Sequence, residues 1–113
     1  MSSDVSADGC RALAAALRDN TALFKLKLDG NKIGNEGAVA LAQALSANAK
    51  LHTLDVCGNG IGDIGAAALV EMLRNNRTVV ALTVDPKTLD PQLEGEMAVL
   101  LEANWERLQE SKK

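Results

Sequence analysis

The chain has 113 residues, enough for one domain, and a formal net charge of −3. Apolar residues make up 47% of it, but only one Phe and one Trp are present, so a core must be built from Leu, Ala, Val and Ile. Twelve basic residues against fifteen acidic ones give no basic surface for phosphate backbones, and no apolar run is long enough to span a bilayer. We therefore expect neither nucleic acid nor a membrane as a partner.

The first part of the chain is predicted to be helical, after an N-terminus (residues 1–4) that we expect to be flexible. Residues 5–22 have helical spacing, and no strand pattern precedes them. Cys10 begins this helix where the later helices have Ala38 and Ala66, which favours a packing role for its side chain. This segment is therefore expected to be the helical half of a unit.

A strand is predicted next, over residues 23–28. Leu26 and Leu28 point to one face of it, and Lys25 and Lys27 point to the other, because successive side chains of a strand alternate. The face with the leucines is expected to be buried. Turn-forming residues end the strand.

The apolar spacing then widens to that of a helix. Asn35 stands where an N-cap would satisfy free backbone donors, and Asn48 stands near the expected C-terminus of the helix. Asp63 and Asn76 hold the same positions one helix later. The stripe expected to be buried consists of Ala40, Leu41, Ala44 and Leu45, followed by Ala68, Leu69, Met72 and Leu73.

The whole unit returns after 28 residues, so the chain is an array of repeats. We expect one domain over residues 5–110: a half repeat at 5–22, then repeats at 23–50, 51–78 and 79–106, with a tail at 111–113. Columns of the same residue type support this division: Gly9, Gly37 and Gly65; Leu17, Leu45, Leu73 and Leu101; and Asn20, Asn48, Asn76 and Asn104.

The pattern LxxLxLxxNxI, which starts at Leu23 and again at Leu51, resembles the leucine-rich repeat. The repeat length and the helical half IGxxGAxxLAxAL resemble the ribonuclease-inhibitor subfamily. The resemblance implies an α/β fold, a leucine-rich-repeat solenoid: a short right-handed βα superhelix with parallel strands on the concave side and helices on the convex side. The strand at 23–28 would then lack an upstream neighbour, and an uncovered strand edge invites pairing, including with a second copy in a homodimer.

The last turn departs from the pattern. Lys87 stands where the earlier turns have Asn31 and Asn59, and Pro86 and Pro91 flank it. Prolines stop a ladder, so the helix that follows is predicted to be a cap with a polar outer face. Its apolar side, from which Trp105 is expected to cover an end of the core, consists of Leu93, Met97, Leu100, Leu101, Trp105 and Leu108.

This closing stretch also resembles the final repeat of the tropomodulin and leiomodin family. The matching residues are Glu96-Met97, Leu101-Glu102 and Asn104, after an extended proline-containing loop. Members of that family use a leucine-rich domain to bind actin at the pointed end of filaments, so the resemblance implies actin as a partner. Nothing here resembles the family's long N-terminal region, so pointed-end capping does not follow from it.

The exposed strand face is the candidate protein-binding site. Stacking would bring equivalent residues of neighbouring strands to about 5 Å from one another. A solvated face of mixed charge is the alternative, and the helix face and the open edge are other candidate surfaces. The predicted site consists of Lys25, Lys27, Asp29, Thr53, Asp55, Cys57, Thr83 and Asp85, with Ala81 among them.

Other chemistry is disfavoured by the same alignment. Asn31 and Asn59 occupy positions of a buried asparagine ladder rather than of a binding pair. Cys57 would need a base to act as a nucleophile, and His52 is expected on the opposite face of the strand. The glycines after Cys57 lack the lysine of a phosphate-binding loop. We therefore predict no catalytic residue, no metal and no cofactor.

The sequence thus predicts a non-catalytic protein-interaction module of the leucine-rich-repeat type. The alternative is an actin-binding cytoskeletal regulator resembling the tropomodulin leucine-rich domain. A structural role at one end of a longer receptor or scaffold is also open. Two cysteines without metal-like spacing are typical of reduced thiols, so a cytoplasmic location is expected.

Overall fold

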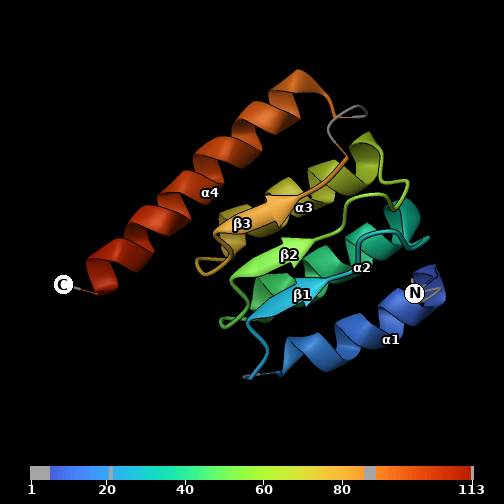
Figure 1. Cartoon of the computed structure of the whole chain (residues 1–113), viewed down its shortest axis with the longest axis horizontal. Coiled ribbons are helices and arrows are strands. Elements are labelled where there is room, and N and C mark those ends of the chain that lie inside the picture. The colour runs from blue at the N-terminus through green and yellow to red at the C-terminus, as the bar shows by residue number, and fades with distance from the viewer. Residues whose placement is uncertain (1–5, 21, 86–88, 113) are drawn as a thin grey trace.

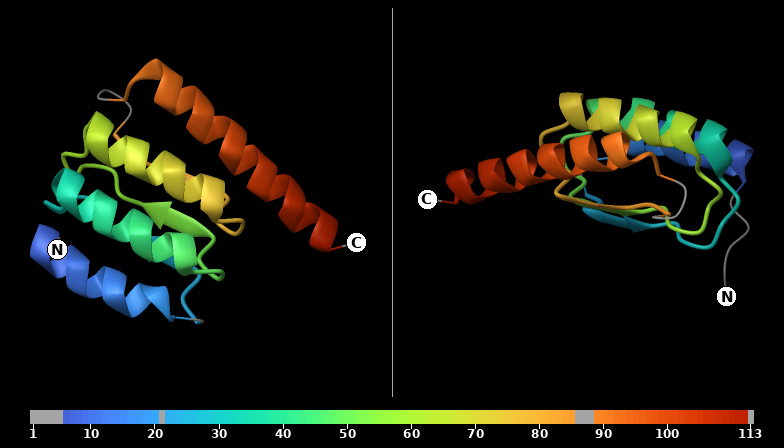
Figure 2. Two further views of the ribbon diagram at one scale, coloured as in Figure 1. Left: turned by 180° about the vertical axis from the view of Figure 1, so that it is seen from behind. Right: turned by 90° about the horizontal axis from the view of Figure 1, so that it is seen from above.

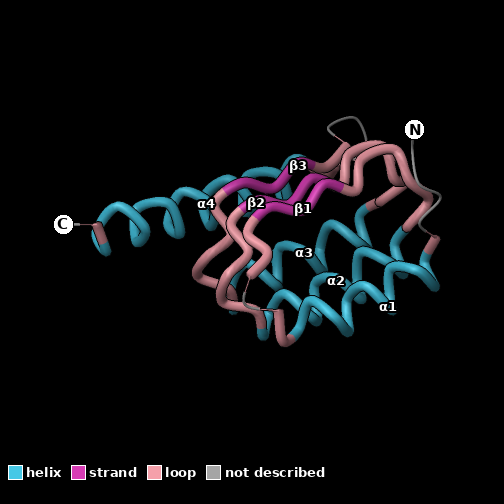
Figure 3. Tube along the Cα trace, turned by 60° about the horizontal axis from the view of Figure 1, so that its bottom comes forward, coloured by secondary structure: helices cyan, strands magenta, loops and turns pink. Residues whose placement is uncertain are grey.

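The computed structural model describes residues 6–20, 22–85 and 89–112. One layer of parallel strands packs on one layer of helices (Figure 1, Figure 3). The predicted alternation of helix and strand is confirmed. The elements are α1 (Ala7–Arg18), β1 (Lys25–Lys27), α2 (Gly34–Ala47), β2 (Thr53–Asp55), α3 (Asp63–Asn75), β3 (Ala81–Thr83) and α4 (Pro91–Ser111). The predicted flexible N-terminus (1–4), Pro86 and Lys87 lie outside the described residues.

The three strands lie in the order β1-β2-β3, and all of their pairs are parallel. Lys27 pairs with Asp55, and Asp55 pairs with Thr83, so the interval of the sequence repeat is also the register of the sheet. Strand β1 is shorter than the predicted 23–28, although backbone hydrogen bonds to the next repeat continue beyond it, from the Leu28 N–H to the Asp55 oxygen at 2.7 Å and from the Gly30 N–H to the Cys57 oxygen at 2.9 Å. Among the described residues, β1 is the first strand of the sheet, and it follows α1, as predicted.

The core lies between the sheet and the helices. The middle repeat is the most completely buried: Leu54 of β2 and Leu69 of α3 have no exposed surface. Helices α2 and α3 approach each other closely because small residues line their contact. A Cβ added at Gly65 would lie 2.9 Å from the Ala38 Cβ, so a larger residue does not fit there.

Buried asparagines tie each repeat to the next, at the loops that follow the helices. The Asn76 Nδ2 donates to the carbonyl oxygens of Leu45 and Asn48, both at 2.8 Å. Its Oδ1 accepts from the backbone N–H groups of Thr78 and Val79, at 2.7 and 2.8 Å. We call this column, which consists of Asn20, Asn48, Asn76 and Asn104, the helix-end ladder.

A second pair of buried asparagines confirms the structural role predicted for Asn31 and Asn59. The Asn59 Nδ2 donates to the carbonyl oxygens of Leu28 and Val56, at 2.8 and 2.9 Å. The Asn31 Nδ2 donates to the Leu28 oxygen at 2.7 Å. These amides satisfy buried backbone groups in the turns and are not available to a ligand.

The N-cap roles predicted for Asn35 and Asp63 are wrong. Both residues lie within the first turn of their own helix, and each serves the start of the next one. The Asn35 Oδ1 accepts from the backbone N–H groups of Gly62 and Gly65, both at 2.9 Å. The Asp63 Oδ1 accepts from the Asp90 N–H at 3.2 Å. These helix starts are therefore satisfied across the repeat interface, which the sequence pattern within one repeat does not reveal.

Helix α4 differs from the other helices in length and direction. Its N-terminal half lies beside α3, and its C-terminal half runs away from the sheet (Figure 2). Met97 and Asn104 are its buried residues. The prediction that Trp105 covers the end of the core is wrong, because 52% of this residue is exposed. The helix caps the core through Met97 and the partly buried leucines Leu93, Leu100 and Leu101.

Candidate functional site on the exposed strand face

The strands form the outer layer of the molecule on the side away from α1, α2 and α3 (Figure 2, Figure 3). On this face, parallel pairing places Lys25 beside Thr53. It also places Lys27, Asp55 and Thr83 in one row. The predicted grouping of the strand residues is therefore present. Their role in binding stays a prediction.

The charges on this face are unevenly distributed. Lys25 and Lys27 are the basic residues of the strands, and both lie exposed on β1. Asp29 and Asp85 come two residues after the last residues of β1 and β3, and Asp55 is the last residue of β2. Side chains of both signs are thus presented from one rigid sheet, which is a basis for charge-selective recognition.

Hydrogen bonds hold the acidic end of the face in place. The Asp85 Oδ1 accepts from the Gly58 N–H at 2.5 Å and from the Cys57 Sγ at 3.4 Å. The Asp55 Oδ1 accepts from the Cys57 N–H at 3.0 Å. The Gly58 N–H holds the pKa of Asp85 below its ordinary value of 3.8. Asp85 is therefore ionised at neutral pH and fixed against the turn that follows β2.

The Cys57 thiol is poorly suited to nucleophilic chemistry. Its hydrogen bond to Asp85 raises its pKa, and burial and the charges of Asp85 and Asp55 act in the same direction. A raised pKa keeps the sulfur protonated, whereas the thiolate is the nucleophile. The ring of His52 lies against Phe24 instead, with 4.9 Å between the ring centroids. Cys10 is buried, as predicted for a packing residue, and burial raises its pKa to about 11.

An exposed aromatic side chain at the start of β1 was not singled out in the sequence analysis. Phe24 directly precedes β1 and is 59% exposed. Its carbonyl oxygen accepts from the N–H groups of His52 and Thr53, at 2.8 and 3.2 Å, which fixes its backbone to β2. By strand alternation Phe24 shares the side of Leu26 and Leu28, so the pattern alone does not predict its exposure. The tertiary structure places it where a partner can reach it, and aromatic residues are frequent anchors of interfaces.

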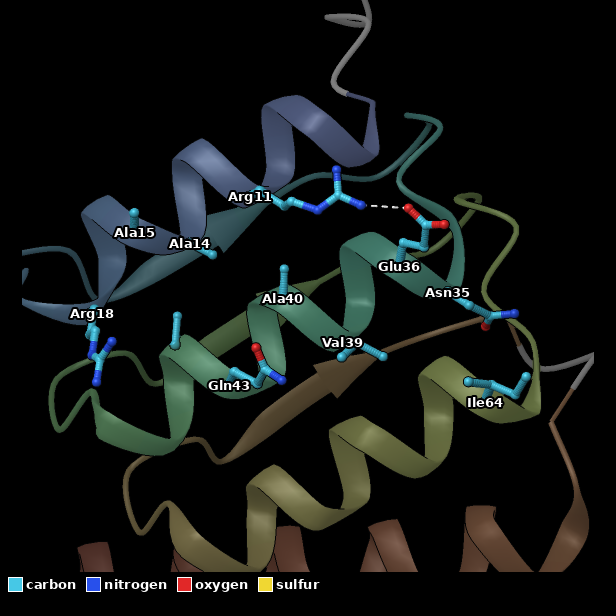
Figure 4. Close-up of a pocket in the computed structure, with 11 residues that line it drawn as sticks. Arg11, Ala14, Ala15, Arg18, Asn35, Glu36, Val39, Ala40, Gln43 and Ile64 are labelled. Carbon is cyan, nitrogen blue, oxygen red and sulfur yellow. Dashed lines mark hydrogen bonds and ion pairs between the residues drawn. The ribbon is translucent and has the colours of Figure 1, made fainter.

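A groove of about 850 Å³ lies on the opposite side of the molecule, over helices α1 and α2 (Figure 4). The Arg11 guanidinium crosses it to the Glu36 carboxylate at 2.6 Å. Small side chains form much of the lining, and Ile64 contributes from α3. The groove is lined by Arg11, Ala14, Ala15, Arg18, Asn35, Glu36, Val39, Ala40, Gln43, Ala44 and Ile64.

The described residues contain no group of three or more His, Cys, Asp or Glu residues that could hold a metal ion. None of the described helices combines the length and apolar character that crossing a membrane requires.

Comparison with known proteins agrees with this geometry. The family model described as "Leucine Rich repeat" matches residues 19–42 and 47–70. These two segments are leucine-rich repeats. Each matched segment contains one of the strands β1 and β2 and part of the helix that follows. No curated protein sequence matches the chain.

Two solved structures share the leucine-rich-repeat fold of the chain. One is "Leiomodin-1 Actin-Binding Site 2 (ABS2)", with a TM-score of 0.87 and 23% identity over 95% of this chain. The other is the tropomodulin C-terminal domain of Caenorhabditis elegans, with a TM-score of 0.82 and 13% identity over 95% of this chain. This chain spans 62% and 65% of those two chains, respectively. The predicted likeness to tropomodulin and leiomodin is therefore confirmed for the fold.

Proposed function

We propose that this chain is a non-catalytic protein-interaction module that binds its partner through the exposed strand face. The observation that carries the proposal is the row of Lys27, Asp55 and Thr83, which the sheet register holds side by side. Rigid presentation lowers the conformational entropy that a binding surface loses on association. The proposed contact residues are Lys25, Lys27, Asp29, Thr53, Asp55, Cys57, Thr83 and Asp85.

The proposal includes the absence of catalysis and a cytoplasmic location. The Cys57 thiol is kept protonated by Asp85, and the His52 ring contacts Phe24 rather than a nucleophile. Cys10 and Cys57 are both free thiols, which is the usual state of cysteines in a reducing compartment. Neither proposal depends on a cofactor.

Actin is the partner that we propose to test first. The support is the likeness of fold to the structure of leiomodin-1 actin-binding site 2, over 95% of this chain. A cytoskeletal role is thus the second, more specific form of the proposal. It predicts contact with actin and makes no claim about filament ends.

The test uses the purified chain with filamentous actin in co-sedimentation and with monomeric actin in analytical ultracentrifugation. We expect Lys27→Glu and Asp55→Lys each to weaken binding by about fivefold or more, because each reverses a charge in the centre of the face. The matched control is Arg18→Glu, which reverses an exposed charge on α1, in the opposite layer. It is expected to bind like the unchanged chain.

The possible outcomes separate the two forms of the proposal. Actin binding that is equal for all variants would place the contact elsewhere and reject the strand face. No association with either form of actin would reject the cytoskeletal role. In that case the face would be tested against any partner that is identified later, with the same three variants.

A further inference from the structure

The groove over the helix layer is formed where one face of α1 meets one face of α2 (Figure 4). Arg11, Ala15 and Arg18 are spaced by four and three residues, which places their side chains on one face of α1. The lining face of α2 has the same spacing and consists of Glu36, Ala40 and Gln43. Both walls of the groove therefore belong to helices that the structure describes.

The groove is hollow because small side chains form its floor. Ala14 of α1 and Ala44 of α2 line it, and both are buried. One repeat later, α3 has Met72 at the position equivalent to Ala44. Met72 is buried as well, and a methionine side chain fills space that an alanine leaves open. The hollow between α1 and α2 thus results from the particular residues of this pair of helices.

A larger apolar side chain from α3 extends the lining. Ile64 is 70% exposed, and it occupies the position that the charged residue Glu36 has on α2. Val39 of α2 is a second lining residue that is only partly buried. Figure 4 shows both of these side chains between α2 and α3. Apolar surface next to a hollow lined by alanines is typical of sites that bind another protein.

The two ends of the groove differ in charge. At one end, the Arg11 guanidinium donates to the Glu36 carboxylate at 2.6 Å and also to Asp8. At the other end, Arg18 is exposed in the last turn of α1, and within the described part of the chain it is in no ion pair. The two arginines are seven residues apart, which is about 10.5 Å along a helix. A positive charge without a described counterion therefore lies two turns from a neutralised one.

We propose that this groove binds an amphipathic helix of another protein, with a carboxylate of that helix paired to Arg18. Apolar side chains at intervals of three and four residues along the bound helix enter the groove over Ala14, Ala40 and Ala44. An extended segment fits less well, because the walls are helices whose backbone groups are already hydrogen-bonded. The groove lies in the layer opposite the strand face, so the inference goes beyond the proposed function.

The experiment uses the ¹⁵N-labelled chain and a synthetic peptide of about 18 residues, which is five turns of helix. The peptide has leucines on one face and glutamates beside them, and a hydrocarbon link on its polar face keeps it helical. A second peptide has lysine in place of glutamate. NMR chemical shifts locate the bound peptide, and fluorescence anisotropy gives its Kd. We expect the largest shifts at Ala15, Ala40 and Gln43, and binding of the lysine peptide that is at least about fivefold weaker.

Charge reversal at Arg18 tests the ion pair. Arg18→Glu is expected to weaken binding of the glutamate peptide by about fivefold or more and to strengthen binding of the lysine peptide. The matched control is Arg77→Glu, which reverses an exposed charge in the loop after α3, and it is expected to change neither Kd. Lys27→Glu, on the strand face, is also expected to leave both values unchanged.

Filling the groove tests its shape. Ala40→Met places a longer side chain in the hollow and is expected to weaken binding of the glutamate peptide by about tenfold or more. The matched control is Ala68→Met, at the equivalent position of α3, which does not line the groove. It is expected to bind like the unchanged chain. NMR spectra that are unchanged outside the substituted helix would verify that each variant retains its fold.

Four results would overturn the inference. Shifts centred on Lys27 and Thr83 would place the peptide on the strand face. Equal binding of the two peptides would reject the ion pair with Arg18. Shifts at the groove that grow with protein concentration in the absence of peptide would identify a second copy as the occupant. No binding at millimolar peptide concentration would reject the groove as a site for an amphipathic helix. The effect of Lys27→Glu on actin binding is independent of all four.

Discussion

The first and last helices of this solenoid pack differently on the repeats beside them. At the N-terminal end, α1 packs on α2 with Cys10, Ala14 and Leu17 buried, and the described residues include no strand beyond β1 (Figure 1). At the C-terminal end, the ladder is closed by Asn104 of α4. The last helix therefore contributes a buried amide to the backbone of the repeat before it, whereas α1 contributes chiefly apolar side chains to its contact with α2.

The largest expected effect is on the free energy of unfolding, when a buried side chain of α1 is truncated and compared with an exposed side chain of α4. Leu17 of α1 is 2% exposed, so Leu17→Ala is expected to lower the free energy of unfolding by about 3 kcal/mol. Trp105 of α4 is 52% exposed, so Trp105→Ala is expected to cost less than about 1 kcal/mol. Urea unfolding monitored by circular dichroism measures both. A cost for Trp105→Ala equal to that of Leu17→Ala would show that Trp105 covers the core after all.

A smaller effect is expected at the ends of the helix-end ladder. The Asn104 Nδ2 donates to the carbonyl oxygens of Asn76 and Val79, both at 2.9 Å. Asn104→Ala leaves these buried acceptors unpaired and is expected to cost about 2 kcal/mol or more. Asn20→Ala, at the more exposed end, is expected to cost about 1 kcal/mol, because water can reach the N–H groups that its Oδ1 accepts from.

The same urea experiment tests this second pair of variants. Equal costs for Asn20→Ala and Asn104→Ala would contradict the difference between the two ends. A nearly neutral Asn104→Ala would mean that α4 does not hold the last loop in solution.

The smallest expected effect is a dependence on pH. The pKa of Asp85 is lower in the folded chain than its ordinary value of 3.8, chiefly because the Gly58 N–H donates to it. A carboxyl group whose pKa is lowered by folding stabilises the folded state above the unfolded pKa, and this contribution is lost as the pH falls through the folded pKa. Asp85→Ala should therefore reduce stability at pH 7 and have less effect near pH 3.

Asp29→Ala, at the equivalent position after β1, is the matched control for this pH experiment. Thermal unfolding between pH 3 and pH 7 would follow both variants. A difference between Asp85→Ala and the unchanged chain that is as large at pH 3 as at pH 7 would reject the bond to Gly58 as its cause.

Much of the fold was predictable from the sequence because its signals are local. The alternation of Leu26 and Leu28 with Lys25 and Lys27 defines a strand with one buried face, and it needs no knowledge of distant residues. The interval between equivalent leucines determined the sheet register, which the pairing of Lys27 with Asp55 confirms. Asparagines at fixed positions also predicted where buried amides satisfy the turns.

Only the tertiary structure decided what happens between repeats and at the ends. Asn35 and Asp63 satisfy the start of the next helix instead of their own. For Asn35 the reason is the close packing of α3 on α2 at Gly65 and Ala38, which spacing along the chain does not reveal. Phe24 is exposed and Trp105 does not cover the core, since no described repeat packs against either side chain. Periodicity determines which way a side chain points, but a neighbouring element decides whether it is buried.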